Sequence, residues 1–198
     1  MNIFQKFTLL YLLLILVQNS FAQQQRDSII YLEEVTVSRP SNIVMKTNGK
    51  AKEVVGFYEN EKFVSLVKNI PVSQLNSITF YFDAKVFKKE AEYEFELLIL
   101  EQDKNGKPGN ALVDKTILFR IQGDKKEKIT LDLSDINIYY RPELFIGFKT
   151  INLSGGSIVT KMAKNTDAVS FYANDATEWS TPVRAFPIEL QLEVNLRP

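Results

Sequence analysis

The chain has 198 residues, which suit one domain with a tail, because domains typically span ~100–200 residues. Hydrophobic residues make up 45% of it, and 24 basic residues balance 24 acidic ones. This excludes the low-hydrophobicity composition of disordered chains and the basic surplus of nucleic-acid-binding proteins. Because the chain contains no histidine and no cysteine, thiol nucleophiles, histidine bases, Cys/His zinc sites and disulfides are excluded too. We therefore predict no catalytic, cofactor-binding or metal-binding residue and no nucleic-acid partner.

The N-terminus has the layout of an export signal. Lys6 precedes an apolar run over residues 7–17 (FTLLYLLLILV), and Ser20 and Ala22 place small residues at −3 and −1 of a cleavage site before Gln23. The run is shorter than the ~20 residues that a membrane-spanning helix needs. We predict that residues 1–22 are a cleaved signal peptide and that the mature protein has no integral membrane span.

The next segment, residues 23–50, is polar and is interrupted by Arg39-Pro40 and by Asn48-Gly49. This composition predicts a flexible, extended leader with one short apolar island at residues 29–37. Ser28 lies in Asp27-Ser28-Ile29, a three-residue pattern that resembles periplasmic O-glycosylation sites of some Gram-negative bacteria.

Residues 51–198 show a dense series of β-prone segments separated by turn signals, with no apolar stripe at helical spacing. The pattern predicts nine strands, at residues 63–68, 75–82, 93–101, 112–121, 128–133, 144–151, 157–162, 168–173 and 186–196. This density favours an all-β, two-sheet antiparallel β-sandwich of jelly-roll-like type. A closed barrel and a β-helix are the alternatives.

Alternation of residue types indicates which strand faces are buried. Even-numbered positions from Ile188 to Val194 are apolar and the odd-numbered positions between them are polar, as in a half-buried antiparallel strand. Ile129, Leu131 and Leu133 follow the same rule. Residues 97–100 (LLIL) are apolar on both faces, which predicts a central strand covered on both sides.

Two acidic features have structural interpretations. The loop from Asp103 to Gly109 resembles a calcium loop only faintly, and its Asn105-Gly106 pair predicts a hairpin connection. Carboxylates crowd one predicted strand at Glu90, Glu92, Glu94, Glu96 and Glu101. Because the middle three alternate along the strand, they indicate a solvated sheet face or a charged edge rather than a glycosidase pair.

Aromatic residues are the candidate ligand-binding class. Trp179 lies in a polar stretch, where a sugar-binding sandwich would present an open ring face, although a loop Trp more often packs on its own domain. The neighbouring candidates are Tyr172, Tyr139 and Tyr140.

Two resemblances follow from the motifs. Residues 32–38 (LEEVTVS) resemble the leader that precedes the plug of TonB-dependent outer-membrane transporters, which implies a partner-binding role for Glu33, Glu34, Val35, Thr36 and Val37. From about residue 55 to 194, the order of features resembles exported carboxypeptidase-like regulatory-domain-type β-sandwich proteins of Gram-negative bacteria. These features are Gly56-Phe57, ITFYF at 78–82, GKPGNAL at 106–112 and LFIGF at 144–148.

The sequence thus predicts a non-enzymatic accessory or binding protein of the Gram-negative cell envelope, in the periplasm, at the outer membrane or outside the cell. The leading hypothesis is a protein-partner module whose leader pairs with an envelope protein by strand addition. A glycan-binding module that uses Trp179 is the alternative, and a hydrolase is the third possibility.

Overall fold

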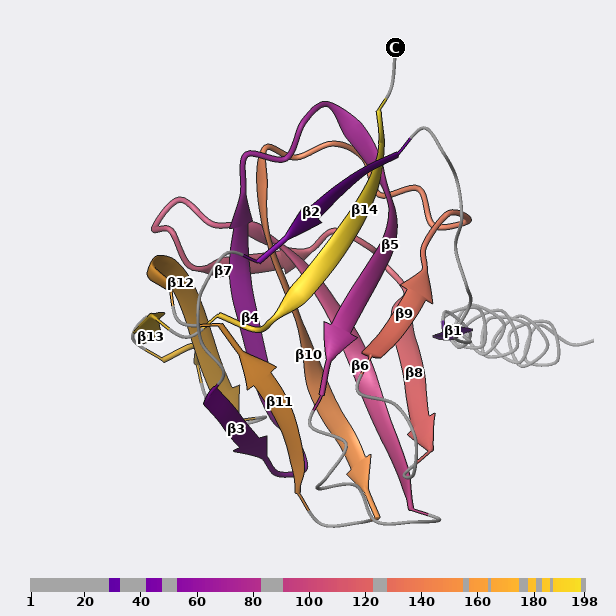
Figure 1. Ribbon diagram of the computed structural model, residues 1–198, viewed down its shortest axis with the longest axis vertical. Helices are drawn as coiled ribbons and strands as arrows, with labels where there is room; N and C mark the ends of the chain where they lie inside the picture. The colour runs from indigo at the N-terminus through magenta and orange to yellow at the C-terminus, as the bar shows by residue number, and fades with distance from the viewer. Residues whose placement is uncertain are drawn as a thin grey trace, which may run out of the picture.

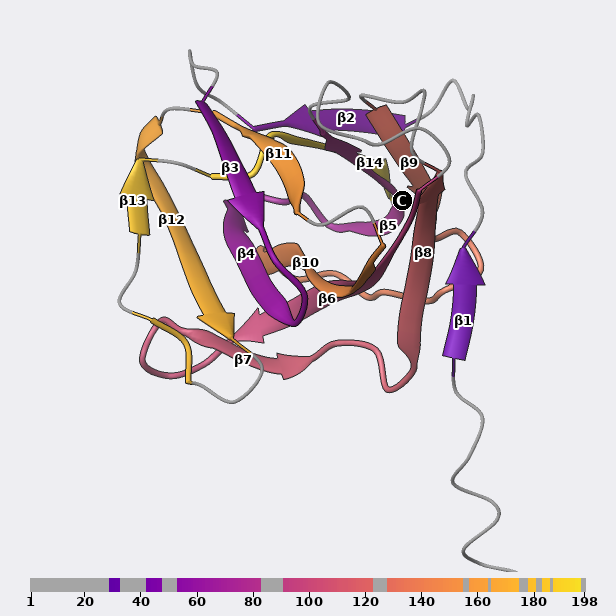
Figure 2. The same ribbon diagram turned by 90° about the horizontal axis from the view of Figure 1, so that it is seen from below.

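The structure is a computed structural model that describes residues 29–32, 42–47, 53–82, 91–122, 128–154, 157–163, 165–174, 178–180, 183–185 and 187–196. Within these ranges the chain forms strands and turns, arranged in two face-to-face layers (Figures 1 and 2). The predicted all-β, antiparallel sandwich is confirmed. None of the described segments forms a helix that is long and apolar enough to cross a membrane.

The first layer is one large sheet. In spatial order it contains β1 (Ile29–Leu32), β8 (Thr116–Gln122), β6 (Glu92–Gln102), β10 (Glu143–Leu153), β4 (Glu61–Lys68), β12 (Asn165–Asn174) and β13 (Val183–Ala185), with β7 (Pro108–Ala111) paired to β6. The pairs are antiparallel except for β1 and β8, which run parallel.

The second layer is made of two smaller sheets. One contains β2 (Asn42–Lys46), β14 (Leu190–Leu196), β5 (Ser73–Tyr81) and β9 (Lys128–Asp132), and the other contains β11 (Ile158–Met162) and β3 (Glu53–Phe57). Single bridges from Phe82 to Thr160 and from Met162 to Ile188 join the two. Because β4, β5 and β6 alternate between layers, as do β8, β9 and β10, successive strands cross the sandwich as in jelly rolls.

The core between the layers is built on phenylalanine rings. The Phe148 ring, from the large sheet, lies 5.9 Å from Phe80 and 6.0 Å from Phe82 of the opposite layer, centroid to centroid. Within its own sheet it lies 5.6 Å from Phe95, which stacks on Phe119 at 5.0 Å. Offset and edge-to-face contacts of this kind add to the free energy of burial.

The predicted inward faces are confirmed. Ile188, Leu190, Leu192 and Val194 are buried, and so are Ile129, Leu131 and Leu133. Strand β6 lies between β8 and β10, and Leu97 and Leu100 are buried on its opposite faces, in two different apolar clusters. The 97–100 run is therefore central and covered on both sides, as its sequence predicts.

The leader differs from its prediction at two places. The expected flexible segment 23–50 contains β1 and β2, which are hydrogen-bonded to β8 and β14. The reason is packing, since the part-buried side chains of Leu32 and Met45 contact the main core. Strands β3, β7 and β13 are not predicted from the sequence, and Ile188, expected within the last strand, instead forms a separate bridge before β14. The signal peptide, Ser28 and the motif residues Glu33–Val37 lie outside the described residues.

Gly147 provides a test of how closely the central strands approach. A Cβ atom added there would lie 1.8 Å from the carbonyl oxygen of Phe63 and 2.7 Å from the Cα atom of Val64, both in the backbone of β4. We expect Gly147→Ala to lower the free energy of unfolding by at least about 2 kcal/mol in urea titrations. Gly56→Ala is the matched control, because the nearest atoms there lie at ordinary contact distances, from 3.9 Å. Equal stability of the two variants would contradict the close approach.

Candidate functional site

The strongest candidate for an interaction site is β2, in the leader. Among the described residues β2 pairs on one side only, with β14, so it forms an edge of the second layer. The strand is fixed at its end by Thr47, whose N–H donates to the carbonyl of Leu190 at 2.9 Å. The Thr47 hydroxyl accepts the N–H of Leu190 at 3.1 Å and lies 3.0 Å from the carbonyl oxygen of Ile188. These contacts are all with the β14 side of the strand, and no described residue pairs with its other side.

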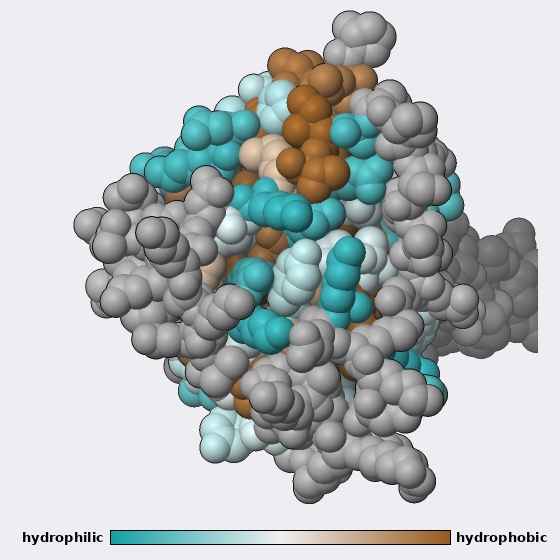
Figure 3. Space-filling model, viewed as in Figure 1, coloured by the Kyte–Doolittle hydropathy of each residue, from teal (hydrophilic) through white to brown (hydrophobic). Residues whose placement is uncertain are grey.

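Exposed apolar side chains gather at the end of this edge. Ile43 is 39% exposed, Val44 49%, Leu196 42% and Val72 58%. Leu196 pairs with Ser73, the residue after Val72, and the preceding residue of β14, Asn195, pairs with Asn42, the residue before Ile43. Figure 3 shows brown side chains at the top of this face, above a polar centre. We call these four residues the edge patch.

The edge patch is not among the sites predicted from the sequence. Its signal is the Ile43-Val44-Met45 triplet, a second short apolar stretch in the polar segment 23–50. The triplet lies outside the apolar island at residues 29–37, of which the structure describes only β1.

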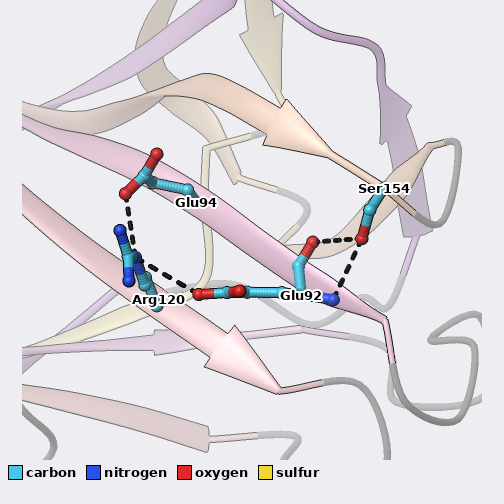
Figure 4. A network of polar contacts seen from close by, with 4 residues as sticks. All are labelled: Glu92, Glu94, Arg120 and Ser154. Carbon is cyan, nitrogen blue, oxygen red and sulfur yellow. Dashed lines mark hydrogen bonds and ion pairs between the residues drawn. The ribbon is translucent and has the colours of Figure 1, made fainter.

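A second strand of the leader, β1, is fastened by an arginine. The Arg120 guanidinium lies 4.9 Å from the centroid of the Tyr31 ring, within the range of a cation–π contact. Arg120 Nε is 2.9 Å from Glu94 Oε1 and 3.3 Å from Glu92 Oε1 (Figure 4). The hydrogen bond to Glu94 raises the pKa of Arg120, so the guanidinium stays charged.

The acidic strand therefore has structural partners. Besides the ion pairs of Glu92 and Glu94, the Glu92 backbone donates to the Ser154 hydroxyl at 3.0 Å and accepts from it at 2.7 Å (Figure 4). Glu101 accepts a hydrogen bond from the Asn110 amide at 3.1 Å. Glu90 lies outside the described residues. Among the residues that the structure does describe, no group of three or more acidic side chains is placed to hold a metal ion.

The Asp103 loop is the predicted hairpin. It joins β6 to β7, and Gly106 takes the positive φ of 79° that the Asn-Gly pair indicates. One Asp103 carboxylate oxygen, Oδ1, accepts the N–H of Lys107 at 2.7 Å and the N–H of Asn105 at 2.8 Å. These bonds, that of Lys107 foremost, lower the pKa of Asp103. The carboxylate is thus used to close the turn.

Trp179 is part-buried. It packs against a second apolar cluster on the outer face of the large sheet, formed by Val64, Leu100, Phe145 and Phe171. The Lys62 ammonium lies over the indole, 5.9 Å from its centroid. A sugar that stacked on this side of the ring would have to displace the lysine.

The three tyrosine candidates do not join Trp179 in one site. Tyr172 is close, since its backbone exchanges hydrogen bonds with Ser180. Tyr139 and Tyr140 are exposed and precede Pro142, whose carbonyl binds the N–H of Ile70, beyond the end of β4. Lys62, beside Trp179, lies near the start of β4, at the opposite end of the strand.

Tyr172 instead belongs to a polar cluster at the start of β4. Its hydroxyl donates to Glu61 Oε1 at 2.6 Å and lies 2.5 Å from Asn174 Oδ1. The other oxygen of Glu61, Oε2, accepts the N–H of Tyr58 at 2.8 Å. Every group in this cluster has a local partner, so the cluster fixes the turn between β3 and β4.

Comparisons with known proteins give a fold neighbour and no family. No protein-family model and no curated protein matches the chain. The clostridial cysteine protease Cwp84 after propeptide cleavage aligns with a TM-score of 0.51 and 10% identity, over 82% of this chain and 42% of that one. The cysteine protease and lectin-like domains of Cwp84, a surface layer associated protein of Clostridium difficile, align with a TM-score of 0.43 and 11% identity, over 74% of this chain and 36% of that one. The chain spans less than half of the length of these two neighbours. The likeness to Cwp84 after propeptide cleavage shows a similar fold alone.

The Tyr172 cluster predicts a specific pH dependence. Burial, followed by the hydrogen bond to Glu61 and its negative charge, raises the pKa of Tyr172 from 10.0 to about 12. Because the pKa is raised in the folded state, the stabilisation is complete below pH 10 and is lost as the pH approaches 12. We expect Tyr172→Phe to be less stable than the wild type by about 1 kcal/mol at pH 8, with the difference shrinking above pH 10.

Urea denaturation of both proteins from pH 8 to pH 12 measures this difference. Tyr58→Phe controls for the loss of an exposed tyrosine. A constant difference between wild type and Tyr172→Phe over the whole range would contradict the predicted role of the Tyr172 hydroxyl.

Proposed function

We propose that the protein is an exported, non-enzymatic binding protein of the Gram-negative cell envelope, in the periplasm or at the outer membrane, and that it engages a protein partner by strand addition along β2. The observation that carries the proposal is the edge patch beside an edge strand. Exposed backbone donors and acceptors of an edge strand accept a further strand, and exposed apolar side chains beside that edge supply contact area.

The character of β2 supports this proposal. Soluble proteins commonly protect their edge strands with proline, bulges or central charges. Strand β2 has the sequence NIVMK, with its one charge at the last position, and pairs with β14 in unbroken register. Its exposed residues Ile43 and Val44 are joined in the edge patch by Leu196, the last residue of β14, and Val72, the residue before β5. An apolar edge of this kind is typical of a site that a partner covers.

The compartment rests on the sequence. The apolar run at 7–17 with Ser20 and Ala22 supports export, and the resemblance of residues 32–38 to the leader of TonB-dependent transporters supports an envelope partner. Glycan binding around Trp179 has weaker support, because the Lys62 ammonium lies over the ring and the exposed pair Tyr139-Tyr140 lies at the other end of β4.

A charge on the edge strand tests the proposal. We expect Val44→Lys in the mature chain to reduce recovery of the partner from envelope extracts about tenfold, because a central lysine on an edge blocks strand addition. Val55→Lys is the matched control, since Val55 is also exposed and also lies on an edge strand, β3. Both variants should unfold within about 0.5 kcal/mol of the wild type.

Quantitative mass spectrometry of the captured proteins gives the readout. Equal recovery by Val44→Lys and Val55→Lys would contradict β2 as the docking edge. Light scattering of the purified protein then shows whether a second copy of the chain is the partner, since it would form a dimer that Val44→Lys dissociates.

A further inference from the structure

The large sheet splits at the junction of β4 and β12. Strand β12 pairs with β4 only from Ser170 to Asn174, and before Ser170 its register follows β13. Strand β4 continues beyond this point to Lys68. The two strands therefore diverge after the Ser65–Ser170 pair, which leaves an open fork in the sheet.

Buried hydroxyl groups define the closed end of the fork. The Ser65 and Ser170 hydroxyl oxygens lie 3.0 Å apart, and Ser65 also accepts the N–H of Ile188 at 2.8 Å. Both serines are buried, and Ile188 belongs to the opposite layer. These bonds join the two layers at the point where the strands separate, so the fork is a fixed feature of the fold.

A pocket of about 430 Å³ occupies the fork. This volume is within the range of small-molecule sites, ~300–1,000 Å³. Its wall is mainly aliphatic, from both layers, and includes Met45, Leu66, Val67, Val169, Leu190 and Leu192. None of the lining residues that the structure describes is aromatic, so this wall is suited to a flexible hydrocarbon chain rather than to a stacked ring.

The charged groups that the structure describes in the pocket wall are of one sign. They are Lys46 and Lys68, and none of the described lining residues is acidic. Both lysines are exposed, and among the described residues neither has an ion pair. Two unpaired ammonium groups beside an aliphatic wall complement a ligand with an anionic head and an apolar tail.

We propose that this fork pocket binds a single acyl chain with an anionic head group. The aliphatic wall takes the chain, and Lys46 and Lys68 bind the head. The site differs from the proposed partner edge in its residues, because β2 supplies Met45 and Lys46 to the pocket wall and none of the four edge-patch residues lines it.

Titration calorimetry with decanoate, below its micelle concentration, tests the proposal on the mature chain. Decanoate should bind saturably and at least about tenfold more tightly than decanol, because decanol lacks the charge. Acetate, which lacks the chain, should not bind. Decyl phosphate identifies the preferred head: tighter binding than decanoate indicates a phosphate and weaker binding a carboxylate. Trp179, the single tryptophan, packs against the same cluster as Leu66 and Val169, so its fluorescence is a second readout.

Two variants separate the parts of the site. Lys46→Gln with Lys68→Gln should reduce decanoate affinity to that of decanol, and Lys104→Gln, in the exposed hairpin, is the control. Ala168→Leu should fill the pocket and abolish binding of both ligands, with Ala111→Leu as its control. If Ala168→Leu does not fold, the decanoate affinity of the double lysine variant still tests the proposal.

Three results would overturn the proposal. They are equal affinity for decanol and decanoate, no effect of the double lysine substitution, and tighter binding of a short peptide with a free C-terminal valine. The last would assign the pocket to a protein C-terminus. Because none of these ligands involves the edge patch, failure here leaves the strand-addition proposal intact.

Discussion

The packing of phenylalanine rings across the two layers is the interaction on which the rest of the fold depends. The chain has no cysteine, so no disulfide holds the layers together. Phe148 contacts Phe80 and Phe82 of the opposite layer and Phe95 of its own, and all four rings are fully buried. Burying a large aromatic side chain contributes a few kcal/mol, which is a large share of the ~5–15 kcal/mol stability of a domain. Phe80 lies in β5, β5 pairs with β14, and β14 pairs with β2, so this contact joins the strands of the second layer to the large sheet.

Strand β2 connects this core to both proposed sites. Met45 is part-buried and packs on the main core, while the preceding residues Ile43 and Val44 are exposed in the edge patch. One short strand thus supplies Met45 and Lys46 to the pocket and Ile43 and Val44 to the docking surface. Residues 42–47 of the leader therefore belong to the sandwich. Thr47 fixes this segment to β14 through its hydrogen bonds with Leu190.

Much of the fold could be predicted because it depends on local patterns. The alternation from Ile188 to Val194 and the doubly apolar run 97–100 determine which faces are buried, and the Asn105-Gly106 pair indicates a hairpin. The missed features depend on contacts between distant segments. Strand β2 is stabilised by β14, about 150 positions later in the chain. The close approach at Gly147 and the divergence of β12 from β4 at Ser170 also cannot be predicted from the sequence, because both depend on which strands pair with each other. Trp179 stands out in the sequence as the single tryptophan, but the Lys62 ammonium over its ring comes from β4, a distant segment of the chain.

The most direct test of strand addition along β2 is site-specific photo-crosslinking in living cells. A benzophenone amino acid replaces Ile43 in the edge patch or, as the control, the more exposed Tyr58 in the turn before β4. Strand addition along β2 predicts a light-dependent adduct of defined mass from position 43 and none from position 58. An adduct from position 58 alone, or equal labelling at both positions, would contradict partner docking at this edge.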